Sequence, residues 1–238
     1  MSTNEPTTST RAGNPGDVPV DRRAQRRDAR RADNRTAILD AAEHVFGEDG
    51  IREGSLRRIA AASGFSTAAI YLFFENKQHL LAETLIRRGD ELIDMLQREA
   101  ARDLTPLVKL HHIVDVTTTF FTERPRFRDM LSHLRGGPSI TGPTLAEFAG
   151  DVTGRFDTAM SALAQLVREG QITGEIRGGN ERALVHLYSV LINEHVFLSA
   201  ADSARTGTLT TEQFHALVDG ALRNPPPPRD RNYRKTHR

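Results

Sequence analysis

Apolar side chains recur at helical spacing, every third or fourth residue, along most of the chain. Capping residues, prolines and glycines mark where these segments begin and end. Together they predict nine helices, over residues 35–47, 55–63, 66–74, 77–101, 106–124, 125–135, 143–169, 181–201 and 211–223. Because almost no segment shows strand periodicity and there are no internal repeats, we expect an all-α fold.

The helix predicted over residues 181–201 is apolar on most of its sides, with Leu184, Leu187, Leu191, Val196 and Leu198 among its side chains. A helix that is apolar nearly all round must be covered nearly all round. We therefore expect other helices to enclose it.

The two ends of the chain differ from the rest. Residues 1–34 are rich in small polar residues, proline and arginine, and residues 224–238 combine a run of prolines with basic side chains. Neither segment carries enough apolar surface to offset the entropy lost on ordering. We predict a disordered Arg-rich arm over 1–34 and a disordered Pro/Arg-rich tail over 224–238.

Residues 55–71 have the composition of a helix-turn-helix, two short helices joined by a sharp turn. Ala60 is small enough for the helices to approach closely, and Gly64 can adopt the left-handed conformation that the turn requires. Ser66 can cap the second helix. This arrangement fits a DNA major groove.

The second of these helices has two predicted faces. One is expected to pack in the core and carries Ile70, Phe73 and Phe74. The other is expected to be exposed and carries Thr67, Ala68 and Tyr71, which lie three and four residues apart. Threonine can hydrogen-bond a base edge or phosphate, and small methyl groups can contact a thymine methyl.

A longer pattern extends this segment on both sides. Its residues are Gly50, Ile51, Gly54, Ser55, Leu56, Ile59, Ala60, Ser63, Gly64, Phe65, Ser66, Ile70, Tyr71, Phe73, Phe74, Lys77 and Leu80. This pattern resembles the DNA-binding signature of the tetracycline-repressor (TetR) family of bacterial transcription regulators. The predicted order of the remaining helices agrees with that family.

The resemblance implies a homodimer with a DNA-binding domain of three helices, residues 35–82, and a ligand-binding and dimerisation domain of six helices, residues 83–223. It implies a repressor that binds a palindromic double-stranded DNA operator and is released by a small-molecule effector. An activator or a ligand-independent DNA-binding regulator is the alternative within this class. An all-α enzyme or a helical protein-interaction adaptor is the alternative outside it.

The family pattern also implies DNA contacts, residue by residue. Arg57 would contact a base or a phosphate, and the phosphate contacts would be Ser55, Tyr71 and Lys77. The positions that read bases would be Thr67, Ala68 and Ala69, and Ser66 would cap the second helix. Phe73 departs from the family, which usually has a Tyr or His there that can donate to a phosphate. We expect that contact to be absent.

Two further sets are hypotheses for the C-terminal domain. Aromatic and polar residues on inward stripes are candidates for a largely apolar pocket that takes a lipophilic effector: Phe121, Met130, His133, Phe156, Met160 and Tyr188. Residues on the last two helices are candidates for the dimer interface: Leu184, Leu191, Leu198, Phe214 and Leu217. The alternative for each pocket residue is an ordinary place in the core.

Charge is unevenly distributed behind a net charge of +1. Residues 21–35 contain seven arginines against three aspartates, whereas residues 36–82 contain four basic and six acidic side chains. Arg22, Arg26 and Arg30 are spaced four apart, so a helical extension would align them. The arm is therefore a candidate for phosphate contacts, and a solubilising tail is the alternative.

The composition and motifs of the chain argue against several other kinds of protein and site. The chain has no cysteine, which removes disulfides, thiolate metal sites and cysteine nucleophiles and suits a reducing cytoplasm. No membrane span, signal peptide, nucleotide-binding loop or catalytic motif is present. The adjacent pair His111 and His112, and the pair His186 and His195, lack metal-ligand spacing. We expect no metal, no cofactor and no enzymatic activity.

Overall fold

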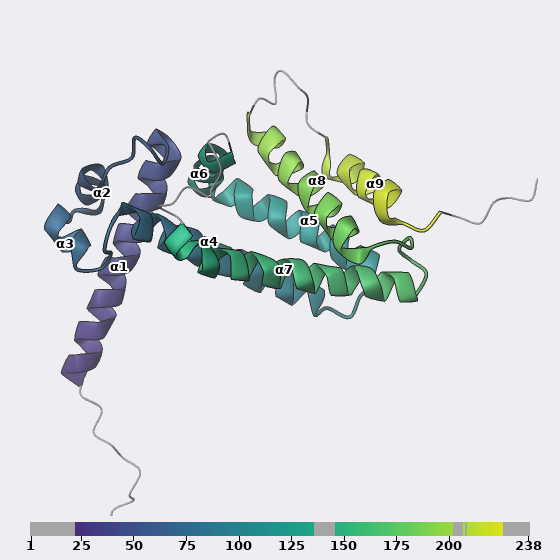
Figure 1. The fold of residues 1–238 in the computed structure, drawn as a ribbon, viewed down its shortest axis with the longest axis horizontal. Helices are drawn as coiled ribbons and strands as arrows, with labels where there is room; N and C mark the ends of the chain where they lie inside the picture. Colours follow the sequence, from purple (N-terminus) through teal and green to yellow (C-terminus); the bar gives the residue numbers. More distant parts are fainter. Residues whose placement is uncertain (1–21, 136–145, 202–206, 208, 226–238) are drawn as a thin grey trace, which may run out of the picture. The chain divides into compact units, whose positions relative to one another are not determined.

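The computed structural model describes residues 22–135, 146–201, 207 and 209–225. They belong to two compact units, residues 1–36 and residues 37–238. The described residues form nine helices and no strand (Figure 1): α1 (Arg22–Asp49), α2 (Leu56–Ser63), α3 (Thr67–Tyr71), α4 (Lys77–Ala100), α5 (Pro106–Glu123), α6 (Pro125–Arg135), α7 (Ala146–Ile172), α8 (Glu181–Ala201) and α9 (Thr211–Leu222). The predicted all-α fold is confirmed.

The beginning of α1 differs from the prediction. The helix begins at Arg22, so residues 22–34 are helical and not disordered. Arginine, alanine and glutamine are good helix formers, and neither glycine nor proline interrupts the chain between Arg22 and Phe46. The apolar periodicity that predicted the start begins only at Ile38, which is why it missed the earlier turns. Residues 1–21, 136–145 and 226–238 lie outside the described residues.

Helix α5 is the central element of the larger unit. It packs against α4, α6, α7, α8 and α9, while α4 and α7 run side by side along much of their length (Figure 1). The apolar side chains of α5 that face these neighbours are almost fully buried: Leu107, Leu110, Ile113, Val114 and Phe120. The burial of several such side chains, at about 1.5 to 3 kcal/mol each, stabilises this part of the fold.

The N-terminus of α5 is capped from a distant loop. Thr105, the residue before α5, makes no side-chain capping bond and instead donates its hydroxyl to Glu175 Oε1 at 2.6 Å. Glu175, between α7 and α8, accepts the Leu107 amide at 3.2 Å through Oε2. A carboxylate is favourable there because the first amides of a helix are unpaired and its N-terminus is electropositive.

Two contacts fix the C-terminal part of α1 to the helices after it. Glu43, with a side chain only 9% exposed, accepts from Arg88 at 2.6 Å and from Arg87 at 3.1 Å, both on α4. Gly47 lies so close to α6 that a Cβ there would be 2.3 Å from the carbonyl oxygen of Arg126. These contacts tie α1 to α4 and α6.

Candidate nucleic-acid interface and cavity

The turn between α2 and α3 has the geometry that the sequence predicts. Gly64 ends α2 with φ 74° and ψ 15°, the left-handed conformation that favours glycine. Ser66 caps α3 by accepting the Ala69 amide at 3.1 Å. Ser55 caps α2 in the same way, accepting from the Arg58 amide at 3.3 Å. The two short helices are therefore held by caps at both N-termini.

Helix α3 has one buried and one exposed side. Ile70 is fully buried, and Phe74 after the helix is 1% exposed. Ala68 is exposed, and Tyr71 is 55% exposed. Thr67 and Ala69 are half-buried at the edges of this face. A short capped helix that presents small side chains and a phenol can approach a base edge and a phosphate together.

Leu72, directly after α3, was not among the predicted DNA-binding residues. Its side chain is 74% exposed. It lies beyond the last residue of α3, where the helical periodicity used for the prediction no longer applies. Only the observed end of the helix shows that this apolar side chain faces away from the core.

The basic side chains near the turn differ in their surroundings. Arg57 is exposed on α2. Its neighbour Arg58 pairs with Asp49 and, at 3.3 Å, with Glu48. Lys77 donates Nζ to the carbonyl oxygen of Arg52 at 3.0 Å, and burial lowers its pKa, opposed by the nearby Glu53 carboxylate. Lys77 thus holds the start of α4 against the loop before α2.

A cavity of about 260 Å³ lies among α4, α5, α6, α7 and α8. Helix α4 forms one wall, and its lining residues are Leu85, Ile86, Gly89, Leu92, Ile93 and Leu96. The polar groups at the cavity are Thr117, Ser189 and Asn193, and no ionisable side chain is among the described lining residues. Such a cavity fits an apolar ligand that carries a hydrogen-bonding group.

Only some predicted pocket residues line this cavity. Phe121 and Met160 do so. Met130 is fully buried and His133 is exposed on α6, and neither is among the lining residues. Tyr188 is not among them either, and its buried hydroxyl donates to the Leu110 carbonyl at 2.5 Å. The side chain of Phe156 lies outside the described part of the structure.

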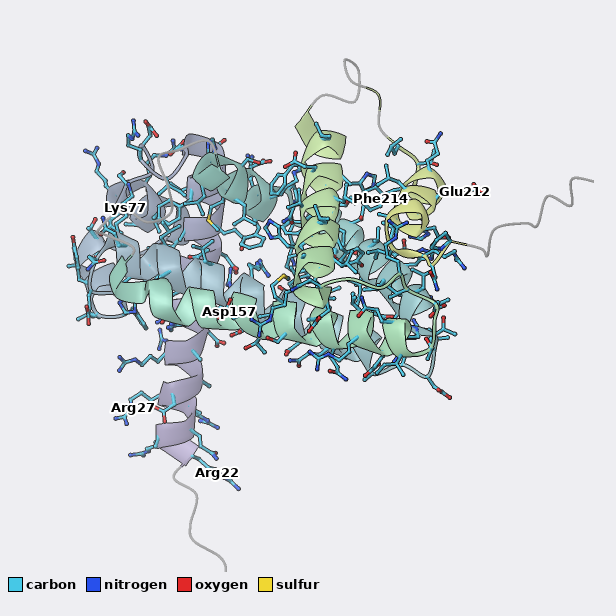
Figure 2. The ribbon with its side chains drawn as sticks, turned by 45° about the vertical axis from the view of Figure 1, so that its right-hand side comes forward. Arg22, Arg27, Lys77, Asp157, Glu212 and Phe214 are labelled. Atoms are coloured by element: carbon cyan, nitrogen blue, oxygen red, sulfur yellow. The ribbon has the colours of Figure 1, made fainter. Side chains whose placement is uncertain are left out.

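The residues predicted for the dimer interface differ in their exposure. Leu198 and Leu217 are exposed by 51% and 42%, while Leu184 and Leu191 are half-buried in a shallow groove between α8 and α9. Phe214, labelled in Figure 2, is 2% exposed in the single chain, and its ring stacks on that of His195. The helix α8 is not enclosed all round, since Leu187 is 59% exposed.

Histidines gather where α5, α8 and α9 meet. The rings of His111 and His215 stack with centroids 4.5 Å apart. His111 Nε2 lies 2.8 Å from an Asp219 oxygen, and His215 Nε2 lies 2.9 Å from an Asp115 oxygen. Among the residues that the structure describes, no group of three or more His, Asp or Glu side chains could hold a metal ion.

Comparisons with known proteins identify the DNA-binding segment. Residues 38–84 match the family model described as bacterial regulatory proteins, tetR family. The DNA-binding segment of this chain is therefore similar to that of the TetR family. This family consists of DNA-binding transcription regulators and not of enzymes, so the chain is a DNA-binding transcriptional regulator.

Known transcription regulators are similar to parts of this chain of different length. The transcriptional regulator UidR of Escherichia coli K12 is 25% identical over 201 residues, which are 79% of this chain and 92% of UidR. The transcriptional repressor BepR of Brucella suis is 37% identical over 78 residues, 33% of this chain and 37% of BepR. The crystal structure of FadR from Bacillus subtilis in complex with stearoyl-CoA has a TM-score of 0.64 at 20% identity, covering 78% of this chain and 94% of FadR.

The TetR-like chain has no described helix that is both long enough and apolar enough to cross a membrane.

Proposed function

We propose that the protein is a homodimeric repressor that binds a palindromic operator and is released by an apolar small-molecule effector. The exposed face of α3, held by the Gly64 turn and the Ser66 cap, carries the proposal. The name of BepR, a repressor, supports the direction of regulation.

The DNA contacts are assigned to the exposed side of α2 and α3. Arg57 and Tyr71 are placed on phosphates or base edges, and Ala68 faces the bases with Thr67 and Ala69 at its borders. Ser55 and Ser66 act through their caps, which orient the two helices. Lys77 binds the Arg52 carbonyl and thereby positions α4. We therefore assign it this positioning role, and the proposed DNA complex does not depend on a phosphate contact from Lys77.

The apolar surface of α8 and α9 supports the homodimer. Leu187, Leu198 and Leu217 are exposed on helices whose other sides contribute buried residues to the core. Apolar side chains grouped on one surface favour burial against a partner. A second copy of the chain would bury the same residues twice about a two-fold axis, as a palindromic operator requires.

The cavity supports the effector. Helix α4 forms one wall of the cavity. The same helix is bonded to the loop before α2 through Lys77, and to α1 through Arg87 and Arg88. A ligand that moves α4 would therefore move the DNA-binding helices, with a coupling of about 1–3 kcal/mol. The stearoyl-CoA in FadR is consistent with an apolar occupant in a related fold.

Binding to DNA from upstream of the protein's own reading frame tests the proposal. We expect Tyr71→Phe to weaken binding about fivefold to tenfold, because one hydrogen bond to a charged phosphate is lost. Tyr188→Phe removes the same hydroxyl from a buried site and should leave DNA affinity unchanged while lowering stability by about 1 kcal/mol. Equal loss in both variants, or no binding by the wild type, contradicts the proposal.

The direction of regulation is tested in cells. A reporter placed behind the bound upstream DNA should rise in expression when the protein is deleted and fall again when it is restored. A fall on deletion would make the protein an activator.

A further inference from the structure

We propose that residues 22–35 of α1 form a second DNA-contacting surface, whose arginines bind phosphates of the same duplex that α2 and α3 read. This inference rests on the proposed DNA-binding function and adds a surface outside the helix-turn-helix. Its partner is the sugar-phosphate backbone of double-stranded DNA.

The residues around the helix-turn-helix supply little positive charge of their own. Residues 36–82 contain six acidic and four basic side chains. Two of those four have partners within the protein: Arg58 pairs with Asp49 and Glu48, and Lys77 is bound to the Arg52 carbonyl. Since phosphate neutralisation by Lys and Arg supplies much of the affinity for DNA, a further basic surface is needed.

The start of α1 carries such a surface. Between Arg22 and Arg35 there are seven arginines and two aspartates. At about 100° per residue, six of the arginines fall within one half of the helix circumference: Arg22, Arg23, Arg26, Arg27, Arg30 and Arg31. All six are exposed, and Figure 2 shows Arg22 and Arg27 extending outward from the helix.

This helix repels itself. Arginines recur at i and i+4, in pairs such as Arg22 with Arg26 and Arg23 with Arg27, and like charges at this spacing each cost about 0.2–0.5 kcal/mol. Arg27 pairs with Asp28 at 3.9 Å, and both side chains are mostly exposed. A polyanion relieves that repulsion, so the helix gains stability when it binds phosphates.

The side chains on the other half of the circumference favour DNA, and not a lipid surface, as the binding partner. It carries Ala24, Gln25, Asp28, Ala29, Ala32 and Arg35 and no large apolar side chain. A helix that binds an anionic membrane inserts Leu, Phe or Trp side chains into the bilayer interface. Because this segment has no such apolar side chains, its arginines are suited to a rigid polyanion such as DNA, which is bound without insertion into a bilayer.

The length and connection of the segment also suit a duplex. Fourteen residues of helix, Arg22 to Arg35, extend about 21 Å, which is comparable to six base pairs of DNA. The segment precedes directly the residues that match the family model. Once α3 has bound, this covalent connection raises the local concentration of the arginines near the same duplex.

The salt dependence of DNA binding tests the proposal on the full chain. The probes are a labelled duplex of about 40 bp of mixed sequence and the upstream fragment, titrated by fluorescence anisotropy from about 50 to 300 mM KCl. The triple variant R22Q/R26Q/R30Q should lower the slope of log K against log[salt] by at least about 1, since each phosphate contact contributes about 0.9. Gln keeps the helix propensity close to that of Arg.

Two matched variants serve as controls. R22K/R26K/R30K keeps the charge and should keep the slope. R98Q/R102Q/R223Q removes the same number of exposed arginines from α4, the loop after it and the end of α9, and should also keep the slope. An unchanged slope in R22Q/R26Q/R30Q, or an equal loss in R98Q/R102Q/R223Q, overturns the proposal.

The results separate this inference from the proposed function. If the wild type binds the upstream fragment selectively and the slope is unchanged in R22Q/R26Q/R30Q, the inference fails and the proposed function stands. If only non-specific binding occurs and it loses slope in that variant, the inference stands and the proposed function fails. Arginine-dependent binding to phosphatidylserine vesicles with no change in the DNA slope would assign the surface to a membrane and overturn the proposal.

Discussion

His111 and His195 are two imidazoles whose burial disfavours the charged form. Burial lowers the pKa of His111, with Asp219 opposing this and His215 and Arg223 adding to it. Burial also lowers the pKa of His195, and the nearby His215 adds to this. Both rings are held in the junction of α5, α8 and α9 by stacking, on His215 and Phe214 respectively.

This arrangement makes folding stability depend on pH. The unfolded chain takes up protons on these histidines near pH 6.5, whereas the folded chain does so only at lower pH. The free energy of unfolding should therefore decrease as pH falls below about 6.5, because the unfolded state then binds more protons. Urea unfolding between about pH 7.5 and 5.5 measures this, and H111Q/H195Q should flatten the dependence; an equally steep dependence in that variant contradicts the assignment.

Local chemistry made some residues of the site predictable. Gly64 and Ser66 were identified because a sharp turn requires a left-handed residue and a helix start requires an acceptor, and both requirements depend on neighbouring residues alone. The surroundings of Met130 and Phe214, by contrast, depend on the packing of distant helices. Periodicity shows that such residues are inward-facing, but it does not show whether a cavity, a core or a partner lies there.

At the scale of elements, Gly47 shows how closely α1 and α6 approach. A Cβ at Gly47 would meet the backbone of Arg126, at 2.3 Å from its oxygen and 3.0 Å from its carbonyl carbon. Backbone atoms have little freedom to move away. The order of the described helices and eight of their nine starts could be predicted closely from the sequence. The contact between Gly47 and Arg126 could not be predicted, since it joins residues far apart along the chain.

Gly47→Ala should lower the free energy of unfolding by about 1 to 3 kcal/mol, because the added methyl group forces α1 and α6 apart. The matched change Gly89→Ala adds a methyl group to the interior of α4, where its Cβ would meet no described atom within 4 Å apart from the adjacent backbone of its own helix. It should stabilise the protein by about 0.5 to 1 kcal/mol through helix propensity. Chemical denaturation of both variants at one protein concentration measures the difference, and a neutral Gly47→Ala would show that the helices can separate freely.

At the scale of the whole molecule, α8 and α9 carry both core and surface. Val185, Tyr188 and Val218 are almost fully buried, while Leu187 and Leu217 are exposed. One side of the pair therefore completes the core of the single chain. The other side is the surface that the proposed homodimer buries.

Leu187→Asp should convert the dimer to a monomer, because a carboxylate at the interface would lose its hydration. The monomer should retain its helical content and bind operator DNA at least about 100-fold more weakly, since only one half-site is then held. Analytical ultracentrifugation and circular dichroism measure both properties. Leu72→Asp places the same charge on another exposed leucine outside this surface and should remain dimeric; dimers in both variants would place the interface elsewhere.

The cap that Glu175 gives to α5 has a consequence for the order of folding. The bonds from Thr105 and Leu107 to Glu175 span 70 and 68 residues, and the bond from Tyr188 to Leu110 spans 78. During synthesis the central helix emerges long before the residues that cap and anchor it. Because contacts between distant residues close large loops, the final assembly of this domain is slow and waits for the last third of the chain.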